Sequence, residues 1–361
     1  MKTSIAILGG GNGAHTMAAD FALRGWKVRM WEDERFIGNL QQVVQTKKIR
    51  ITGVIQGVAE LEMVSSDLAA VVEGCRFVCI VTPSFAHDSI AEKLKGLVTK
   101  DQVIVIYPGA FSSLMFKKLL GEECPVLCEV NNLPYDTRLK GPGNVFCSGL
   151  NATNVAFMPA SAADDLLEEV RQLHPFEKVY QDVLECGLSI VNPALHSGAC
   201  AINIGHIEQQ NVRGMYCMYE HYTPACAKLS IAIDEERKAV GRAFGYHLRP
   251  IEDFAKKPEG YQWRWQDLYQ TMHGDISLTQ INGPDSIWNR YLTEDCPNGL
   301  VPWIALGDMV GVDCPLMRGI VCMYSAVHET DWWATGRNDT WLGLSGMTKE
   351  EILEYVKTGK K

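Results

Sequence analysis

The sequence predicts a doubly wound parallel α/β sheet in its N-terminal half and a mostly helical domain in its C-terminal half. Short apolar strands alternate with helices up to about residue 185, and a glycine-rich turn follows the first strand. After about residue 186 the period-two alternation of strands gives way to helical spacing. Because repeated strand–helix units connect with one handedness, the first half is expected to form a parallel sheet.

The length and composition indicate a globular chain of two domains. The chain has 361 residues, of which 47% are hydrophobic and 21% are charged. This balance excludes a chain that is disordered, collagen-like or a coiled coil throughout. Because a single core rarely grows to this length, we expect a first domain over residues 1–185 and a second over residues 186–361.

The charge balance narrows the class of partner. Lys and Arg number 34 and Asp and Glu number 43, which gives a net charge of −9. This excess of acidic residues argues against nucleic acid or an anionic membrane as the main partner. A small anionic substrate is still compatible, because a local pocket can be basic in an acidic protein.

Cysteine spacing and the absence of targeting signals favour a cytoplasmic protein. The twelve cysteines show no CxxC pair, so we expect free thiols and no metal site. The apolar run before the first glycines is too short for a signal peptide. Residues 186–207 lack Asp, Glu, Lys and Arg but contain Asn, Pro and His. We therefore interpret them as a buried segment rather than a membrane span.

Each element of the first half has its own pattern. Residues 14–23 have helical spacing, and residues 49–64 alternate at period two around two glycines, which predicts a hairpin. Continuous apolar runs predict strands that are buried on both faces of the sheet. These predicted strands are Ser4–Leu8, Lys27–Trp31, 76–81 and 102–107.

The second half carries long segments with helical spacing, of which residues 231–244 and 348–356 are the clearest. Thr348 and Glu351 form a capping-box pattern at the start of the latter. This half is therefore predicted to be mostly helical.

The first glycine-rich turn fits the dinucleotide-binding fingerprint G-x-G-x-x-A. Gly9 permits the tight turn, Gly11 lets the backbone approach a pyrophosphate, and Ala14 allows close packing of helix on strand. The following helix offers its N-terminal N–H groups to the phosphates. The fingerprint therefore predicts a Rossmann-type site. The residues of this turn expected to bind the cofactor are Gly9, Gly11, Asn12, Gly13 and Ala14.

An acidic run at the end of the second strand bears on the choice of cofactor. Glu32 lies 23 residues after Gly9, close to the spacing expected for a carboxylate that binds the ribose. Asp33 and Glu34 follow it, and Arg35 is the only nearby cation in the sequence. Because a 2′-phosphate would meet concentrated negative charge, we expect NAD rather than NADP.

Two further turns lie at the carboxyl ends of predicted strands, the edge where open α/β sheets bind ligands. Thr82 and Pro83 form the first, and residues 107–109 form the second. Thr82 and Pro83 are candidate cofactor contacts, although ordinary strand termination explains them as readily. His15 and His87 lie near these turns and either contact the cofactor or are structural.

The motifs together resemble those of the octopine/nopaline (opine) dehydrogenases. The resemblance covers essentially the whole chain and rests on GGGNGAH, VTPSFAH, YPGAF, NPALH and RYLTEDCPNGL. It implies a Rossmann-type N-terminal domain and an all-helical C-terminal domain. The reaction implied is reductive condensation of an amino acid with a 2-keto acid such as pyruvate, by NAD(P)H-dependent hydride transfer to the imine. The resemblance also implies that His196 and Asp295 are catalytic and that Arg290 holds a substrate carboxylate.

The types of these residues suit that chemistry. A secondary amine must lose a proton before hydride leaves, and histidine titrates near neutral pH. Asn192 and Pro193 predict an N-cap and a first helical residue, which places His196 in the first turn of a helix. Asp295 would orient the imidazole, and it precedes Pro297, where we expect a helix to end. From the residues alone, His196 is equally compatible with a core histidine bonded to a carbonyl.

Arg290 has two interpretations. A planar guanidinium binds a carboxylate in two-point fashion, which suits either substrate. Arg290 and Glu294 could instead form a surface pair four residues apart. Arg290 and Asp295 would point about 140° apart on one continuous helix, so a shared site requires a break in the helix between them.

Two alternatives belong to other classes. One is a two-domain reductase of a 2-keto or 2-hydroxy acid, similar to ketopantoate reductase. Such enzymes typically use a lysine, and the sequence has none between Cys186 and Val212. The other is an NAD-binding sensor without activity, which the His, Asp and Arg set argues against. The sequence names neither the amino acid nor the keto acid, and a homodimer is left open.

Overall fold

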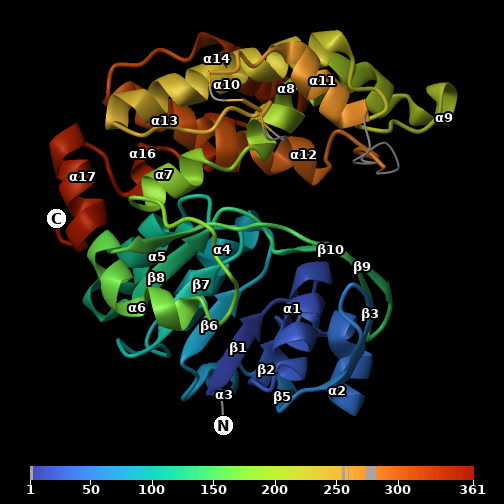
Figure 1. The fold of residues 1–361 in the computed structure, drawn as a ribbon, viewed down its shortest axis with the longest axis vertical. Helices are drawn as coiled ribbons and strands as arrows, with labels where there is room; N and C mark the ends of the chain where they lie inside the picture. The colour runs from blue at the N-terminus through green and yellow to red at the C-terminus, as the bar shows by residue number, and fades with distance from the viewer. Residues whose placement is uncertain (1–2, 254–256, 259, 274–281) are drawn as a thin grey trace. The chain divides into compact units, whose positions relative to one another are not determined.

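The computed structural model describes residues 3–253, 257–258, 260–273 and 282–361. The chain forms two compact units (Figure 1). The first unit contains residues 1–187 and 353–361, and the second contains residues 188–352.

The first unit is built on a seven-stranded sheet in which six strands are parallel and the last is antiparallel to its neighbour. The chain leaves the first strand in one direction and later returns to its other side, which creates the switch point where such sheets bind ligands. This arrangement is the predicted doubly wound, Rossmann-type fold. The strands in spatial order (Figure 1) are β11 (Val155–Met158), β8 (Val126–Val130), β7 (Val103–Ile106), β6 (Phe77–Ile80), β1 (Ser4–Leu8), β2 (Lys27–Trp31) and β5 (Met63–Ser65).

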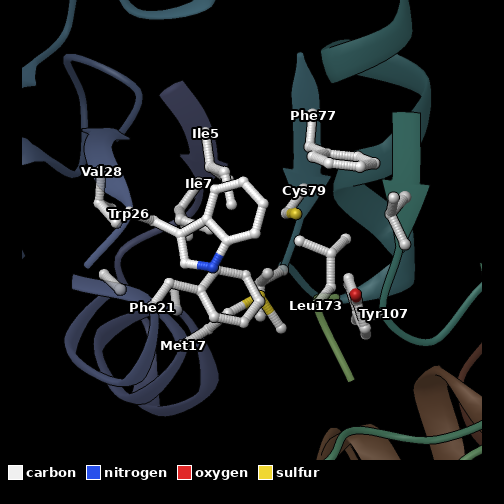
Figure 2. Packing of buried hydrophobic residues seen from close by; sticks show 14 of the residues in the cluster. Ile5, Ile7, Met17, Phe21, Trp26, Val28, Phe77, Cys79, Tyr107 and Leu173 are labelled. Atoms are coloured by element: carbon white, nitrogen blue, oxygen red, sulfur yellow. The ribbon is translucent and has the colours of Figure 1, made fainter. Parts of the chain in front are cut away.

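The core of this unit lies between the sheet and its helices. Ile5 of β1 stands in register with Val28 of β2 and Phe77 of β6, and all three are fully buried. Figure 2 shows Phe21 and Trp26 packed against this region of the sheet. Side chains on both faces are apolar because parallel strands are covered on both sides. The helices of the unit are α1 (Asn12–Leu23), α2 (Gln41–Thr46), α3 (Leu68–Val72), α4 (His87–Leu94), α5 (Ser112–Leu120), α6 (Ala163–Val170) and α7 (Val183–Leu188), the last of which reaches the boundary.

The predicted hairpin over residues 49–64 is confirmed as an antiparallel pair and belongs to a second, four-stranded sheet. The sequence does not predict this sheet. Met63 and Val64, expected in the hairpin, belong instead to Met63–Ser65, which joins the large sheet. The strands of the small sheet in order are β4 (Gly57–Glu60), β3 (Lys48–Gly53), β10 (Asn144–Leu150) and β9 (Tyr135–Gly141).

The described residues of the second unit contain helices and no strand. Helices α8, α10 and α14 pack against one another (Figure 1). The helices of this unit are α8 (Asn192–Glu208), α9 (Gln210–Arg213), α10 (Pro224–Phe244), α11 (Trp265–His273), α12 (Arg290–Thr293), α13 (Val301–Met309), α14 (Pro315–Val327), α15 (Trp332–Thr335) and α16 (Asp339–Leu342).

A buried ion pair organises the second unit. Arg237 and Asp234 lie on α10 with fully buried side chains, and Arg237 Nε is 2.7 Å from Asp234 Oδ1. Arg237 also donates to the carbonyls of Leu188 and Arg249, while Ile251 N–H donates to Asp234. Breaking a buried ion pair leaves an uncompensated charge, so these bonds are costly to lose. They hold the segment that leads into α8 against α10.

The C-terminal helix departs from the predicted domain organisation. The sequence assigns all of residues 186–361 to the second domain, but residues 353–361 belong to the first unit. They include most of α17 (Lys349–Thr358), whose Tyr355 and Val356 are buried. An amphipathic helix does not encode which unit covers its apolar face. The predicted capping box is confirmed, since Thr348 Oγ1 accepts from Glu351 N–H at 3.3 Å and Thr348 N–H donates to Glu351 at 2.8 Å.

Two general properties accompany this fold. All twelve cysteines are free. Among the described residues, no helix combines the length and the apolar character that crossing a membrane requires.

The first unit contains a histidine enclosed by aromatic rings. His174 is 5% exposed, and the rings of Phe21, Tyr107 and Tyr135 lie 5.2 to 5.6 Å from it. Its Nε2 atom has no hydrogen-bond partner among the described residues. Burial, and secondarily the charge of Arg24, lower the pKa of His174 to about 3. The folded protein therefore holds this imidazole neutral.

This histidine should make the first unit sensitive to acid. In the unfolded chain its pKa is about 6.5, so protonation favours unfolding progressively as the pH falls below that value. Between pH 8 and pH 5 the loss from this group is about 2 kcal/mol. Urea unfolding followed by circular dichroism should show a smaller loss of stability over this pH range in His174→Leu. The exposed-residue control His247→Gln should match the wild type, and equal pH dependence in all three proteins would contradict the prediction.

Candidate active site

The fingerprint turn lies at the carboxyl edge of the sheet, where its backbone is held by two strands. Gly9 has φ +127°, a conformation that L side chains rarely adopt, and its N–H donates to Trp31 C=O at 2.8 Å. A Cβ at Gly9 would lie 2.5 Å from the carbonyl oxygen of Val81. Only glycine therefore fits between the ends of β1 and β6.

The N-terminus of α1 fits a phosphate group. Gly11 occupies the N-cap position with no side-chain cap, and a Cβ there would meet no described atom within 4 Å. The first N–H groups of this twelve-residue helix have no partner within the helix, and no side chain caps them at Gly11. Asn12 uses its side chain elsewhere, since Oδ1 accepts from Leu139 N–H of β9 at 2.8 Å. Gly13 packs closely against Val81, and Ala14 is buried.

Glu32 stands beside this turn, as the ribose-binding prediction requires. Its Oε1 accepts from Asp33 N–H at 2.9 Å, and a Cβ at Gly10 would lie 2.4 Å from its Oε2. Burial raises the pKa of the Glu32 carboxyl, while the N–H groups of Asp33 and Gly10 oppose that shift. The structure thus brings Glu32 together with the fingerprint.

The cations near this acidic run are engaged with Asp33. Arg35 Nε lies 2.8 Å from Asp33 Oδ1, and this bond is the main reason why the pKa of Asp33 falls to about 2. Lys93 of α4 lies 3.5 Å from Asp33 as well. In the fold Arg35 is therefore not the only cation near the acidic run, because Lys93 is distant in sequence and close in space.

The turn after β6 offers a hydroxyl to a ligand. Thr82 Oγ1 is buried and has no hydrogen-bond partner among the described residues. A Cβ at Gly9 would lie 3.0 Å from Thr82 Cγ2, so this turn borders the fingerprint. Pro83 caps the short turn Ser84–Ala86, and its carbonyl accepts from Ala86 N–H. An unpartnered hydroxyl, open helix N–H groups and a carboxylate fit a dinucleotide bound at this edge.

The two histidines near these turns make structural contacts. His15 Nδ1 lies 3.1 Å from the carbonyl oxygen of Gly11, and burial lowers the pKa of this imidazole. His87 Nδ1 lies 2.6 Å from Ser112 Oγ. Both side chains are fully buried.

In the second unit, the structure brings His196 and Asp295 into direct contact. His196 Nδ1 is 2.7 Å from Asp295 Oδ2, although 99 residues separate them. The two side chains are 6% and 15% exposed. Burial raises the pKa of the Asp295 carboxyl, and the neighbouring imidazole opposes this shift. Since a carboxylate accepts, Nδ1 carries the proton and Nε2 presents its lone pair.

A close approach of two backbone segments makes this contact possible. Asp295 precedes a π-helical turn over Cys296–Leu300. A Cβ at Gly299 in this turn would lie 2.2 Å from Pro193 Cγ, near the start of α8. Glycine thus lets the turn pack directly on the helix that carries His196.

Two local expectations are corrected. The sequence predicts Asn192 as N-cap, but α8 begins at Asn192 and Val191 is the N-cap, with helical φ and ψ of −92° and −16°. His196 therefore lies just after the first turn. The helix expected to end at Pro297 ends at Thr293, and Pro297 stands at the start of the next helical segment, where its missing N–H costs nothing.

Two tyrosines complete the surroundings of His196. Tyr291 stacks on the imidazole with ring centroids 4.2 Å apart. The hydroxyl of Tyr219 lies 3.4 Å from His196 Nε2. Neither tyrosine is predicted from the sequence as a site residue. Tyr291 adjoins Arg290 in the motif RYLTEDCPNGL, a signal that could have identified it, whereas Tyr219 lies in no recognised motif.

Arg290 is largely exposed and is not in direct contact with the pair. Its side chain is 64% exposed, and its Nε lies 3.3 Å from Glu294 Oε2. For Arg290 and Asp295 to face one site, the helix between them has to be broken. This break is present, because α12 ends at Thr293 before Asp295. Burial raises the pKa of Asp295, and the charge of Arg290 is a minor influence that opposes this rise.

A fingerprint turn on a parallel sheet and a histidine–carboxylate pair on a helical unit define a dinucleotide-dependent dehydrogenase. The family model of the NAD/NADP octopine/nopaline dehydrogenase alpha-helical domain matches residues 179–328, and the N-terminal model of NAD-dependent glycerol-3-phosphate dehydrogenase matches residues 4–119. Opine dehydrogenase of Arthrobacter sp. (strain 1C) is 30% identical, with 97% of this chain and 98% of that protein covered. The chain belongs to the octopine/nopaline dehydrogenase family, and its cofactor is NAD.

Solved structures agree on the fold. An octopine dehydrogenase structure described with NADH and pyruvate has a TM-score of 0.80 and 21% identity, with 100% of this chain and 99% of that chain covered. A ketopantoate reductase of the PanE/ApbA family from Ralstonia eutropha has a TM-score of 0.61 and 16% identity, with 90% and 98% covered. The alternative of a ketopantoate-type reductase therefore shares the fold, while family membership favours the opine dehydrogenase.

The geometry around Glu32 predicts a preference for NADH over NADPH. A 2′-phosphate would meet the Glu32 carboxylate, while Arg35 and Lys93 are engaged with Asp33. The kcat/KM for NADH should exceed that for NADPH by about tenfold or more. Glu32→Gln should narrow this ratio, and Glu34→Gln on the exposed neighbour should not. Equal or NADPH-favouring values in the wild type would show that Arg35 or Lys93 binds the phosphate instead.

Proposed function

We propose that His196 is the acid–base group and Asp295 its orienting partner in this chain's reaction. The chain is an NAD(P)-dependent oxidoreductase acting on CH–NH donors. The reaction is reductive condensation of an amino acid with a 2-keto acid to an N-(carboxyalkyl)amino acid. The 2.7 Å contact between His196 and Asp295 is the observation that carries the proposed roles.

The contact sets which nitrogen of His196 reacts. Asp295 accepts a hydrogen bond from Nδ1–H, so the Nε2 lone pair is available to remove a proton from the substrate ammonium. The resulting imidazolium is stabilised by the carboxylate at 2.7 Å. Bound NADH supplies the hydride that reduces the C=N bond. In the direction of condensation, His196 then gives a proton to the substrate nitrogen. In the reverse reaction it receives a proton from that nitrogen.

The surroundings make His196 a positioned base. Tyr291 stacks on the ring and restricts its rotation, and the bond to Asp295 fixes its edge. A base held in one orientation loses little entropy when it engages substrate.

We assign Arg290 to the binding of a substrate carboxylate. Its side chain is 64% exposed, so a ligand can reach it, and its Nε lies 3.3 Å from Glu294 Oε2. The terminal nitrogens suit two-point binding of a carboxylate. The keto acid and the amino acid both carry such a group. A cytoplasmic location stays a prediction from the sequence, which leaves a homodimer open.

Substitution of the pair should separate chemistry from cofactor binding. His196→Ala should lower kcat by about 10² to 10⁴ and leave NADH affinity unchanged. Asp295→Asn should cause a comparable or smaller loss, and the double variant should be little worse than the worse single variant. The assay records NADH oxidation over a grid of amino acids and keto acids, and NADH binding is followed by fluorescence.

The exposed-residue variant His247→Ala serves as the control and should retain wild-type kcat. Near-normal kcat in His196→Ala would contradict the assigned role. Oxidation of NADH by a keto acid without any amine would contradict the condensation itself.

Arg290 should act on substrate binding. Arg290→Gln should raise the KM of one carboxylate substrate by about tenfold or more, because a charged hydrogen bond contributes roughly 1.5 to 3 kcal/mol. Arg249 provides a matched control, since it is 68% exposed and pairs with Asp253 four residues on. Equal KM values in Arg290→Gln and Arg249→Gln would remove Arg290 from the site.

A further inference from the structure

Condensation requires protons to reach the keto oxygen, whereas hydride transfer does not. The keto oxygen gains charge when the amine adds to the carbonyl carbon, and it must later leave as water. This oxygen and the reacting nitrogen are bonded to the same carbon. A group that assists the oxygen must therefore lie close to the base that serves the nitrogen.

The structure places one hydroxyl in that position. Tyr219 is 9% exposed, and its hydroxyl oxygen lies 3.4 Å from His196 Nε2. The Nδ1 edge of the imidazole is engaged by Asp295, and Tyr291 stacks on one face of the ring. A reacting nitrogen that approaches Nε2 therefore comes within reach of the Tyr219 hydroxyl.

We propose that Tyr219 is a second catalytic residue, which donates its phenolic proton to the substrate oxygen that is lost as water. This inference rests on the proposed condensation and on the role of His196. With no substrate bound, the hydroxyl faces the lone pair of Nε2. A separation of 3.4 Å is long for an O–H donor, so the substrate displaces this contact at little cost.

The protonation state of Tyr219 suits a donor. Burial raises the pKa of its hydroxyl, and the nearby Tyr291 and Asp295 shift it in the same direction. The side chain thus stays protonated throughout the neutral range.

The protons balance through Tyr219 and His196. Nε2 first takes a proton from the substrate ammonium. When the amine adds, a C–N bond forms, the oxygen takes a proton from Tyr219, and the phenolate recovers one from Nε2. The nitrogen, now cationic, then gives a proton to Nε2. When the C–O bond breaks, the nitrogen lone pair forms the C=N bond, and this second proton passes through Tyr219 to the oxygen, which leaves as water. Ammonium and ketone thus give the protonated imine and water, and hydride from NADH then gives the neutral secondary amine.

Tyr219→Phe removes the hydroxyl and keeps the ring. Its kcat for condensation should fall about 10²-fold, the loss typical of one lost donor at a developing oxyanion. NADH affinity should be unchanged. Tyr222→Phe is a matched control, because Tyr222 is also buried and its hydroxyl contacts Ser230 Oγ at 2.7 Å. This control should keep kcat within about threefold of the wild type.

An isotope effect tests which step is slowed. With NADH deuterated at the transferred position, the effect on kcat/KM of the keto acid should be equal to or smaller than the wild-type value in Tyr219→Phe. A larger isotope effect would show that hydride transfer itself was impaired and would overturn the proposal. An unchanged kcat would overturn it too. If no pair of substrates makes the wild type oxidise NADH, the condensation fails first, and the two failures are distinguishable.

A second variant keeps the test valid if Tyr219→Phe does not fold. Tyr219→3,5-difluorotyrosine retains the hydroxyl and lowers its pKa. The basic limb of the kcat–pH profile should move to lower pH, whereas the same substitution at Tyr222 should leave it in place. A profile identical to that of the wild type would assign Tyr219 a structural role only.

Discussion

The carboxylate of Asp295 is the constraint on which the site of the helical unit depends. A largely buried carboxylate is costly unless it is paired, and its partner here is the imidazole of His196. The π-helical turn, the glycine that lets it approach α8 and the stacked Tyr291 all serve that pairing. One electrostatic requirement thus fixes the tautomer of the histidine, the plane of its ring and the direction of its free nitrogen.

The first unit meets a different requirement, which is to leave backbone and side-chain donors available to a ligand. Gly9 adopts a conformation that only glycine tolerates readily, and α1 begins without a side-chain cap. Thr82 keeps a buried hydroxyl without a protein partner. Such groups reduce the stability of the free protein and become satisfied when a polar ligand binds.

Much of the fold could be predicted from the sequence, because its signals are local. Ser4–Leu8 is a short apolar run that ends in glycines, whereas Lys27–Trp31 mixes charged and apolar residues before the acidic run. The predicted bounds of both strands match the structure. The small sheet escaped prediction because β9 and β10 mix polar and apolar residues on a half-exposed surface. The contact between His196 and Asp295 could be anticipated only through motif resemblance. The contact between Tyr219 and His196 could not be predicted, because nothing in the sequence around Tyr219 indicates which side chain it contacts after folding.

The return of the last nine residues to the first unit has a consequence for synthesis on the ribosome. The first unit is encoded in two stretches with the whole helical unit between them. Its sheet emerges early, but the helix that completes it emerges only after the whole helical unit. The helical unit, from residue 188 to residue 352, is a continuous segment that can fold while the first unit still lacks that helix. Completion of the first unit therefore waits until residues 353–361 have been made, so the first domain to begin folding finishes after the second.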